Sequence, residues 1–276
     1  MRFLVLVFLM SLSFAGFSQS DRFRARFEMG VMGGGSYYIG DLNSSKHFVY
    51  SKPAFGAIFR YNLGYRAALR LTGTYGNVWA ADSESDDPFQ NNRNLSFKSK
   101  LYEVAFGVEV HMFEYTIATM RKPISPYFFY EMAYMRMNPQ TEYNGNTIDL
   151  QTIGTEGQGS SLSDKSRYKL NQLTIPLGIG VKFNLRKRLA MSLEYGIRKT
   201  FTDYLDDVSG NYVDPDMLSA ENGPIAGELS NPSLDGASRT GFNRGNDATK
   251  DWYVFYGAMI TFKPYKKDIC TFQGGF

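Results

Sequence analysis

Apolar and polar side chains alternate along the segment from Leu189 to Leu205, LAMSLEYGIRKTFTDYL. Its odd positions are mostly apolar or aromatic, whereas its even positions up to Thr202 are small, polar or charged. A period of two is the pattern of a β-strand with two unlike faces, and it lasts for the about 9–11 residues that a tilted strand needs to cross a bilayer. The segment therefore predicts a transmembrane strand, with its odd face in lipid and its even face in a barrel interior.

Seven further segments alternate in the same way, and they centre on residues 27–39, 55–63, 67–79, 95–113, 127–134, 172–183 and 252–262. Two of them are irregular. The parity reverses before Lys100, which indicates either a β-bulge or a hairpin stem that stands above the membrane. Pro176 lacks a donor for the strand ladder, so it indicates a bulge or a locally unpaired position.

The connections between these segments differ in length. The long polar ones are residues 40–52, 81–94, 138–169 and 203–251, and the short ones lie near residues 63–65, 114–123 and 186–188. Alternate connections of an antiparallel barrel lie on opposite sides, and bacterial outer-membrane barrels have long external loops and short periplasmic turns. The sequence therefore predicts an all-β protein: an eight-stranded antiparallel transmembrane β-barrel of the OmpA-like kind, in the cell outer membrane, with both termini in the periplasm.

The first 20 residues have the features of a secretory signal peptide. Arg2 precedes an apolar run, and the small residues at 18–20 suit a cleavage site before Asp21, so residues 1–20 are interpreted as a secretory signal peptide. We expect the barrel over residues 21–263 and a periplasmic tail over residues 264–276. An aromatic content of 16% suits the aromatic girdles of such a barrel. The net charge of +3, without a stripe of Lys and Arg, argues against nucleic acid as a partner.

Ten positions that point inward by parity are charged, with five acids and five bases. They are Glu28, Arg60, Arg66, Arg70, Glu103, Glu109, Glu131, Lys182, Glu194 and Arg198. The interior of an eight-stranded barrel is just wide enough for side chains, and desolvated charges must be paired. We therefore expect a plugged, salt-bridged lumen, and the alternative is a proton or ion pathway.

Few residues suit catalysis or the binding of a metal ion or cofactor. We expect the protein to have no catalytic residue, no metal site and no cofactor. His47 lies in the first long loop and His111 points inward, and no GxSxG motif accompanies them. Asp203, Asp206 and Asp207 are candidates for Ca²⁺ but lack the spacing of an EF-hand loop, so a solvated or turn-forming role is the alternative. Cys270, the one cysteine, lies in the tail and is a candidate for a disulfide with a partner chain or for an unpaired thiol.

Four stretches resemble a known family. They are GGGSYYIGDLN (Gly33 to Asn43), LRLTGTYGNVWAADS (Leu69 to Ser83), NLSFKSKLYEVAFGVE (Asn94 to Glu109) and TDYLDDVSGNY (Thr202 to Tyr212). They are similar to the PorG-like outer-membrane β-barrel component of the type IX secretion system of Bacteroidota. The last stretch is the most specific, because alternating strands alone would fit any small barrel.

The resemblance implies a non-catalytic role. It implies a barrel that tethers a periplasmic ring of PorK-type lipoprotein and PorN-type subunits to the outer membrane, for protein secretion and, in some members, gliding motility. No contact residue is implied by it. Two other functions stay open from the residues alone: an adhesin or ligand-binding barrel, and a small hydrolase, each acting through the external loops.

Overall fold

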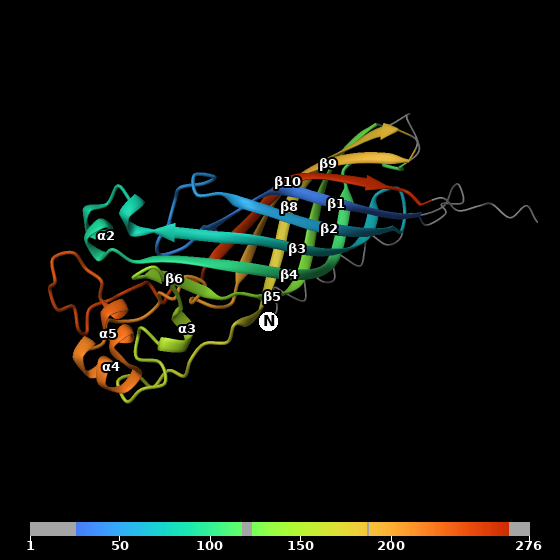
Figure 1. Cartoon of the computed structure of the whole chain (residues 1–276). Coiled ribbons are helices and arrows are strands. Elements are labelled where there is room, and N and C mark those ends of the chain that lie inside the picture. The colour runs from blue at the N-terminus through green and yellow to red at the C-terminus, as the bar shows by residue number, and fades with distance from the viewer. Residues whose placement is uncertain (1–25, 118–122, 187, 265–276) are drawn as a thin grey trace, which may run out of the picture.

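The computed structural model describes residues 26–117, 123–186 and 188–264 (Figure 1). Eight strands run antiparallel in the order β3-β2-β1-β10-β9-β8-β5-β4, and β4 pairs back onto β3, which closes a barrel. These strands are β1 (Arg26–Ile39), β2 (Lys52–Asn62), β3 (Ala67–Ala81), β4 (Ser96–His111), β5 (Ile124–Arg136), β8 (Asn171–Arg186), β9 (Leu189–Thr200) and β10 (Trp252–Phe262). The predicted fold class is confirmed.

Alternation along the strands sets the two faces of the wall. In β4, Val104 and Phe106 are 59% and 57% exposed, while their neighbours Glu103 and Ala105 are buried inside. The same outward apolar face recurs on the other strands of the closed sheet. The barrel thus presents a continuous apolar surface, and exposed apolar area of this extent in a folded protein marks contact with lipid or a partner.

The fourth strand continues beyond the apolar band without a bulge. The register between β3 and β4 is unbroken from Ala67↔Val110 to Ala81↔Ser96. Phe97 and Leu101 are buried inside this extension, while Lys98 and Lys100 lie on its outer side. The reversal of the pattern before Lys100 is therefore a hairpin stem with a polar outer face and an apolar interior, one of the two structures that the sequence left open.

Pro176 occupies a locally unpaired position. Pairing of β8 with β5 runs as far as Leu177↔Tyr130 and resumes at Thr174↔Ala133 in the same register, whereas Pro176 faces Arg198 in the ladder with β9. The sheet therefore accommodates the missing N–H donor of Pro176 by a local gap in pairing with β5, and no bulge forms there. The register shift between β8 and β9 lies elsewhere, between Asn184 and Arg186.

The long connections fold into ordered elements, which corrects their prediction as plain loops. They form η2 (Asp82–Glu84), α2 (Pro88–Arg93), β6 (Pro139–Tyr143), β7 (Asn146–Asp149), α3 (Leu150–Ile153), α4 (Pro215–Asn222) and α5 (Pro224–Ser230). Figure 1 shows α2, α3, α4, α5 and β6 gathered at one end of the barrel. We call residues 40–51, 82–95, 137–170 and 201–251 the cap, its end of the barrel the loop end, and the opposite end the turn end.

The cap is continuous with the barrel wall, in both strand pairing and apolar packing. β6 pairs with β4 at Lys98↔Gln140, in the register already set by Tyr102↔Arg136 of β4 and β5. One cluster of buried apolar side chains runs from Met32, Ile58 and Met259 in the lumen to Leu205 and Val208 in the cap. No helix among the described residues is long and apolar enough to cross a membrane.

Candidate functional site

Five buried charges from five different strands meet at the centre of the lumen. Arg70 of β3 holds both carboxylate oxygens of Glu194, at 2.9 and 3.0 Å, and its Nε lies 3.1 Å from Glu131. Arg60 of β2 lies 2.7 Å from Glu109 and 3.2 Å from Glu194. Bidentate, charge-assisted pairs of this kind are the strong ones, and here they tie opposite walls of the barrel together.

Aromatic rings fill the space that these ion pairs leave. The Tyr127 hydroxyl donates to Glu194 at 2.6 Å, and the Arg70 guanidinium carbon lies 4.1 Å from the centre of the Phe129 ring. Removed from water, a guanidinium gains both from its carboxylate partners and from the ring face. The central layer is therefore packed as well as paired.

A second charged layer lies toward the turn end. Lys182 Nζ lies 2.8 Å from Glu109 and 3.5 Å from Glu28, and Asn62 donates to Glu28 at 2.7 Å. The ring of His111 stacks on that of Tyr115, with ring centres 5.1 Å apart. Tyr115 belongs to the connection after β4, so this connection folds back and helps to close the turn end.

A third layer lies toward the loop end. Arg198 Nε is 3.5 Å from Glu103, and Glu103 also accepts a hydrogen bond from the Tyr253 hydroxyl. The Arg198 guanidinium carbon lies 4.8 Å from the centre of the Phe255 ring. Above this layer the lumen continues into the apolar interior of the cap.

Nine of the ten inward charges named from the sequence lie buried in these layers, and Arg66 does not. Arg66 is exposed in the turn between β2 and β3, where Leu63 N donates to Ala67 O at 2.9 Å. The alternation was extended past the end of the strand, where parity no longer fixes direction. Five carboxylates thus meet four cations, with His111 Nε2 3.0 Å from Glu109 as the remaining basic group.

The described cavities lie away from the charged layers. Two pockets, of about 500 Å³ and 250 Å³, are at the loop end, and neither is lined by a residue of the central layer. The ion pairs and rings described above cross the charged section of the lumen.

The segment TDYLDDVS fastens the cap to the barrel mouth. Tyr38 of β1 donates from its hydroxyl to Asp206 and, at 3.1 Å, to Asp251. Asp251 in turn accepts from Leu205 N at 3.0 Å. Burial and the neighbouring Asp251 raise the pKa of Asp206 well above its usual range. The single phenol proton can serve one carboxylate at a time, and the raised pKa of Asp206 favours a retained proton that lets the two carboxyl groups lie side by side.

Asp207 lies at the centre of a separate cluster within the cap. It accepts hydrogen bonds from the hydroxyls of Thr155 and Tyr168, and Arg244 donates to its backbone carbonyl at 2.6 Å. Arg244 also lies 3.2 Å from Glu156. Burial raises the pKa of Asp207 to about 6, against the lowering effect of Arg244.

The ion pair between Arg93 and Asp82 links the connection between β3 and β4 to the Asp207 cluster. Arg93 contacts both oxygens of Asp82 at 2.7 Å and donates to the carbonyl of Arg244 at 2.9 Å. Asp82 also accepts from Leu95 N at 3.0 Å. No periodic pattern marks Arg93, Arg244 or Glu156, so this network could not be predicted from the sequence.

The candidate calcium ligands diverge. Asp206 faces Tyr38, Asp207 faces Tyr168 and Arg244, and Asp203 Oδ2 lies 3.9 Å from Lys250. Within the described residues, no group of at least three His, Cys, Asp or Glu side chains is placed to hold a metal ion. Asp206 instead joins the cap to Tyr38 of β1, and Asp207 joins parts of the cap through the hydroxyls of Thr155 and Tyr168.

His47 and Cys270 complete the candidates. His47 is exposed, and its Nδ1 lies 3.0 Å from the hydroxyl of Tyr37, which lies 2.7 Å from that of Tyr195. Cys270, the tail beyond residue 264 and the expected signal peptide lie outside the described residues.

A family model described as "Domain of unknown function (DUF6089)" matches residues 1–220 of the 276. The chain belongs to the DUF6089 family. No curated protein matches it significantly. This DUF6089 member is similar to Neisserial surface protein A, at 9% identity and a TM-score of 0.43 over 86% of this chain and 97% of the other. It is also similar to Ail, the attachment invasion locus protein of Yersinia pestis, at 9% identity and a TM-score of 0.41 over 88% and 100%. A further similar structure is the outer membrane protein OprG from Pseudomonas aeruginosa, at 12% identity and a TM-score of 0.39 over 87% and 98%.

The closed wall of this DUF6089 member and its outward apolar face define its class. Every strand of the closed sheet has a partner on both sides, and the exposed band consists of side chains such as Val31, Val104 and Ile179. Only helices and closed barrels satisfy all backbone groups in a bilayer. The protein is a small outer-membrane β-barrel protein.

Proposed function

We propose that the protein is a non-catalytic component of a type IX protein secretion system, which anchors a periplasmic ring of PorK-type and PorN-type subunits to the outer membrane. The observation that carries this proposal is the filled lumen. Arg60 and Arg70 with their carboxylate partners occupy its centre, Tyr115 lies at the turn end and the cap covers the loop end. A barrel built in this way serves as an anchor in the membrane and not as a conduit.

The four stretches that carry the PorG-like resemblance support the proposal, because they meet at one place. They supply Tyr38 and Asp206, which are hydrogen-bonded at the barrel mouth, Phe97, whose ring packs edge-on against Tyr38, and Asp82, which accepts from Leu95 N. Residues that a family shares for its architecture are expected at such buried polar junctions, where each partner is needed to satisfy the others. The shared stretches therefore describe how the anchor is built, and the ring contacts lie elsewhere.

The turn end is the proposed docking side. β1 begins there and β10 ends there, so residues 26 and 264, the two ends of the described chain, lie on that side. In the proposed orientation the turn end faces the periplasm and the cap faces outward. Arg66 and Arg186 are exposed at the turn end and offer positive charge to a periplasmic partner.

The test is a pull-down from detergent-solubilised outer membranes through a tag on the C-terminal tail, with and without reductant. We expect wild-type protein to recover the ring subunits, and an Arg66→Glu/Arg186→Glu variant to recover at least severalfold less. An Arg167→Glu/Lys169→Glu variant is the matched control, because both residues are exposed in the cap. Cys270→Ser reports whether a reductant-sensitive band depends on that thiol.

A deletion strain supplies the second measurement. Loss of secretion of proteins with C-terminal sorting domains, restored by the wild-type gene, supports the secretion role. Recovery of the barrel alone, together with normal secretion in the deletion strain, contradicts it.

One observation favours a second function, surface binding through the cap. Phe89, Leu234 and Phe242 are 58%, 72% and 69% exposed on the cap, outside the apolar band of the wall. Apolar side chains rimmed by polar loops are typical of contact surfaces. If Phe89→Ser/Leu234→Ser/Phe242→Ser abolishes adhesion while secretion continues, this function replaces the first one.

A further inference from the structure

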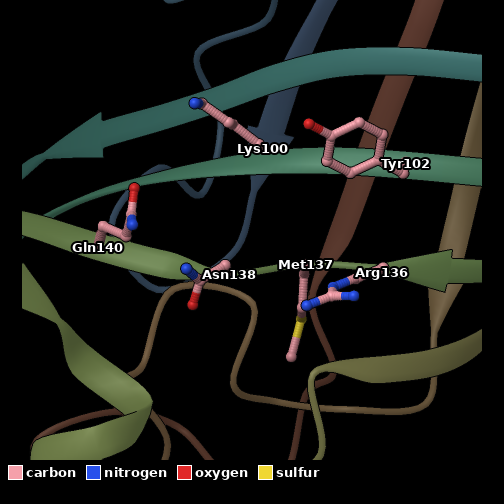
Figure 2. Close-up of a pocket in the computed structure, with 6 residues that line it drawn as sticks. All are labelled: Lys100, Tyr102, Arg136, Met137, Asn138 and Gln140. Carbon is pink, nitrogen blue, oxygen red and sulfur yellow. The ribbon is translucent and has the colours of Figure 1, made fainter.

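A pocket of about 500 Å³ lies on the outer wall at the loop end, between β4 and the junction of β5 with β6. It is lined by Lys100, Tyr102, Arg136, Met137, Asn138 and Gln140. Figure 2 shows Lys100 and Tyr102 on one strand and Arg136, Met137, Asn138 and Gln140 along the neighbouring segment. Nothing in the proposed anchoring role uses this pocket.

The pocket exists because two strands separate briefly. β4 pairs with β5 up to Tyr102↔Arg136 and with β6 from Ser99↔Pro139 onward, so Met137 and Asn138 leave the ladder. Met137 N donates instead to Leu170 O at 2.9 Å, and Asn138 N donates to the hydroxyl of Ser99 at 3.0 Å. These bonds hold the opening in the wall, so the pocket is part of the fold.

The pocket lies at the edge of the apolar band. Below it, Val104 faces Tyr134 and Phe106 faces Met132, and all four side chains are more than half exposed. A strand rises about 3.3 Å per residue, so Tyr102 stands about 7 Å above Val104 and Lys100 about 13 Å above it. Aromatic and basic side chains at this height lie among lipid headgroups.

Two cationic side chains line this pocket. Lys100 and Arg136 are exposed on the outer face, and no ion pair is recorded for either in the described structure. Because Arg136 is opposite Tyr102, Lys100 is its diagonal neighbour, about 7–8 Å away across the two strands. Both side chains are long and flexible, so their charged ends can turn toward an anion at this pocket.

The nearest carboxylates are already bonded to other groups. Asp149 accepts from the amides of Asn138 and Gln140 at 3.0 and 2.6 Å, and Glu142 lies 2.7 Å from Lys98. Lys98 balances Glu142, whereas Asp149 keeps its negative charge because its two donors are neutral amides. Lys100 and Arg136 together with Asp149 therefore leave one net positive charge around the pocket. Other exposed lysines at the same rim are arranged differently, because Lys52 lies over the ring of Trp79 and Lys199 over that of Trp252.

We propose that this pocket binds the phosphate of a membrane lipid headgroup, with Lys100 and Arg136 as its ligands and Tyr102 packed against the lipid below it. A guanidinium matches the geometry of phosphate oxygens, and an ammonium adds a point charge. The position beside exposed acyl-facing side chains selects a phosphate carried on lipid over a free one. The site is independent of the secretion role and of the orientation of the barrel, because both leaflets carry headgroup phosphates.

The test uses the full-length protein in detergent micelles and phosphatidic acid as the probe, with binding followed by native mass spectrometry. Since each basic side chain near an anionic lipid surface contributes about fivefold, Lys100→Gln/Arg136→Gln is expected to weaken binding about thirtyfold. The control Lys52→Gln/Lys199→Gln removes the same charge from β2 and β9, each two strands away from the β4–β5 pair, and screening over that separation is expected to keep the change in binding below about threefold. Lys100→Arg/Arg136→Lys keeps the charge and is expected to retain most of the affinity.

Two further probes identify the ligand. Diacylglycerol, which lacks the phosphate, is expected to bind at least tenfold more weakly than phosphatidic acid, and inorganic phosphate is expected not to compete at equal concentration. Equal losses in the pocket and control variants would mean diffuse attraction and overturn the proposal. Competition by inorganic phosphate would assign the site to a soluble anion, and unchanged binding in the pocket variant would remove it.

Discussion

The lumen and the cap both bury charged networks, yet they are built from different parts of the chain. In the lumen, Arg70 and its partners come from strands whose register is fixed by the closed ladder. In the cap, Arg244 meets Glu156 and Asp207, and all of these lie in connections between strands. The strand ladder of the wall fixes the positions of the lumen charges. In the cap, the ion pairs and hydrogen bonds themselves hold the connecting segments in place.

This difference predicts different consequences when a charge is removed. The barrel cannot relax around a lost lumen charge, because every strand has a partner on both sides. The cap can open locally while the wall stays closed, since regions of one protein differ in their local stability. Variants of matched chemistry in the two regions can therefore test whether they behave as separate units.

The largest effect is expected in the lumen. Arg70→Met leaves Glu131 and Glu194 buried without their main partner, and breaking even a single buried pair costs about 3–5 kcal/mol. A loss above that range would consume most of the stability of a typical protein. We expect no heat-modifiable, folded barrel on refolding, as followed by gel mobility and urea unfolding in detergent.

Arg66→Met is the control for that variant, because the side chain is exposed in a turn and its loss should change the free energy of unfolding by about 0.5 kcal/mol or less. Adding Glu131→Gln and Glu194→Gln to Arg70→Met should restore part of the folded fraction, since the unpaired charges are gone. A folded Arg70→Met barrel with wild-type unfolding would show that the ion pairs are dispensable.

The contrast between these two arginines also shows what alternation can predict. Within the strands, a period of two determined the facing of Arg60, Arg70 and Glu194, because a closed wall has only two sides. At Arg66 the strand has already ended, and the same count gave the wrong face. Parity is thus a property of the ladder, and it fails where the ladder stops.

The cap could not be predicted in this way. Its polar composition indicated loops, and residues such as Arg93 and Asp206 resembled a solvated surface, although both are buried. Their burial depends on partners far along the chain, such as Asp82 for Arg93 and Tyr38 for Asp206. No local pattern encodes such pairings, so only the resemblance of TDYLDDVS to a family drew attention to the junction.

The next effect is expected in the cap alone. Arg244→Met removes the contacts to Glu156 and to the carbonyls of Asp207 and Ser230, which should cost the cap about 3–5 kcal/mol. We expect proteinase K to cleave within residues 201–251 much faster than in the wild type, while the barrel fragment keeps its heat-modifiable mobility.

Arg239→Met is the matched control, because Arg239 pairs with exposed Asp235 and such surface pairs contribute about 0–1 kcal/mol. Cleavage of the Arg244→Met cap at the wild-type rate would contradict a self-supporting cap network. Loss of the folded barrel as well would show that cap and wall unfold as one unit.

The smallest effect, which requires no mutation, follows from the carboxyl groups of the cap. Burial raises the pKa of Asp207 to about 6, above its ordinary value of 3.8. The folded cap therefore binds this proton more tightly than the unfolded chain does, so the contribution to stability is complete below pH 3.8 and is lost as the pH rises through about 6. The difference between the two pKa values corresponds to a free energy of at most about 3 kcal/mol.

Hydrogen exchange of residues 201–251, corrected for intrinsic rates, should accelerate between pH 4.5 and 7.5, whereas amides of β3 and β4 should show no such change. Asp207→Asn carries no titrating proton at this position and should flatten the profile in the cap. A profile of equal steepness in that variant would assign the pH dependence to Asp206 and Asp251, where burial also raises the pKa.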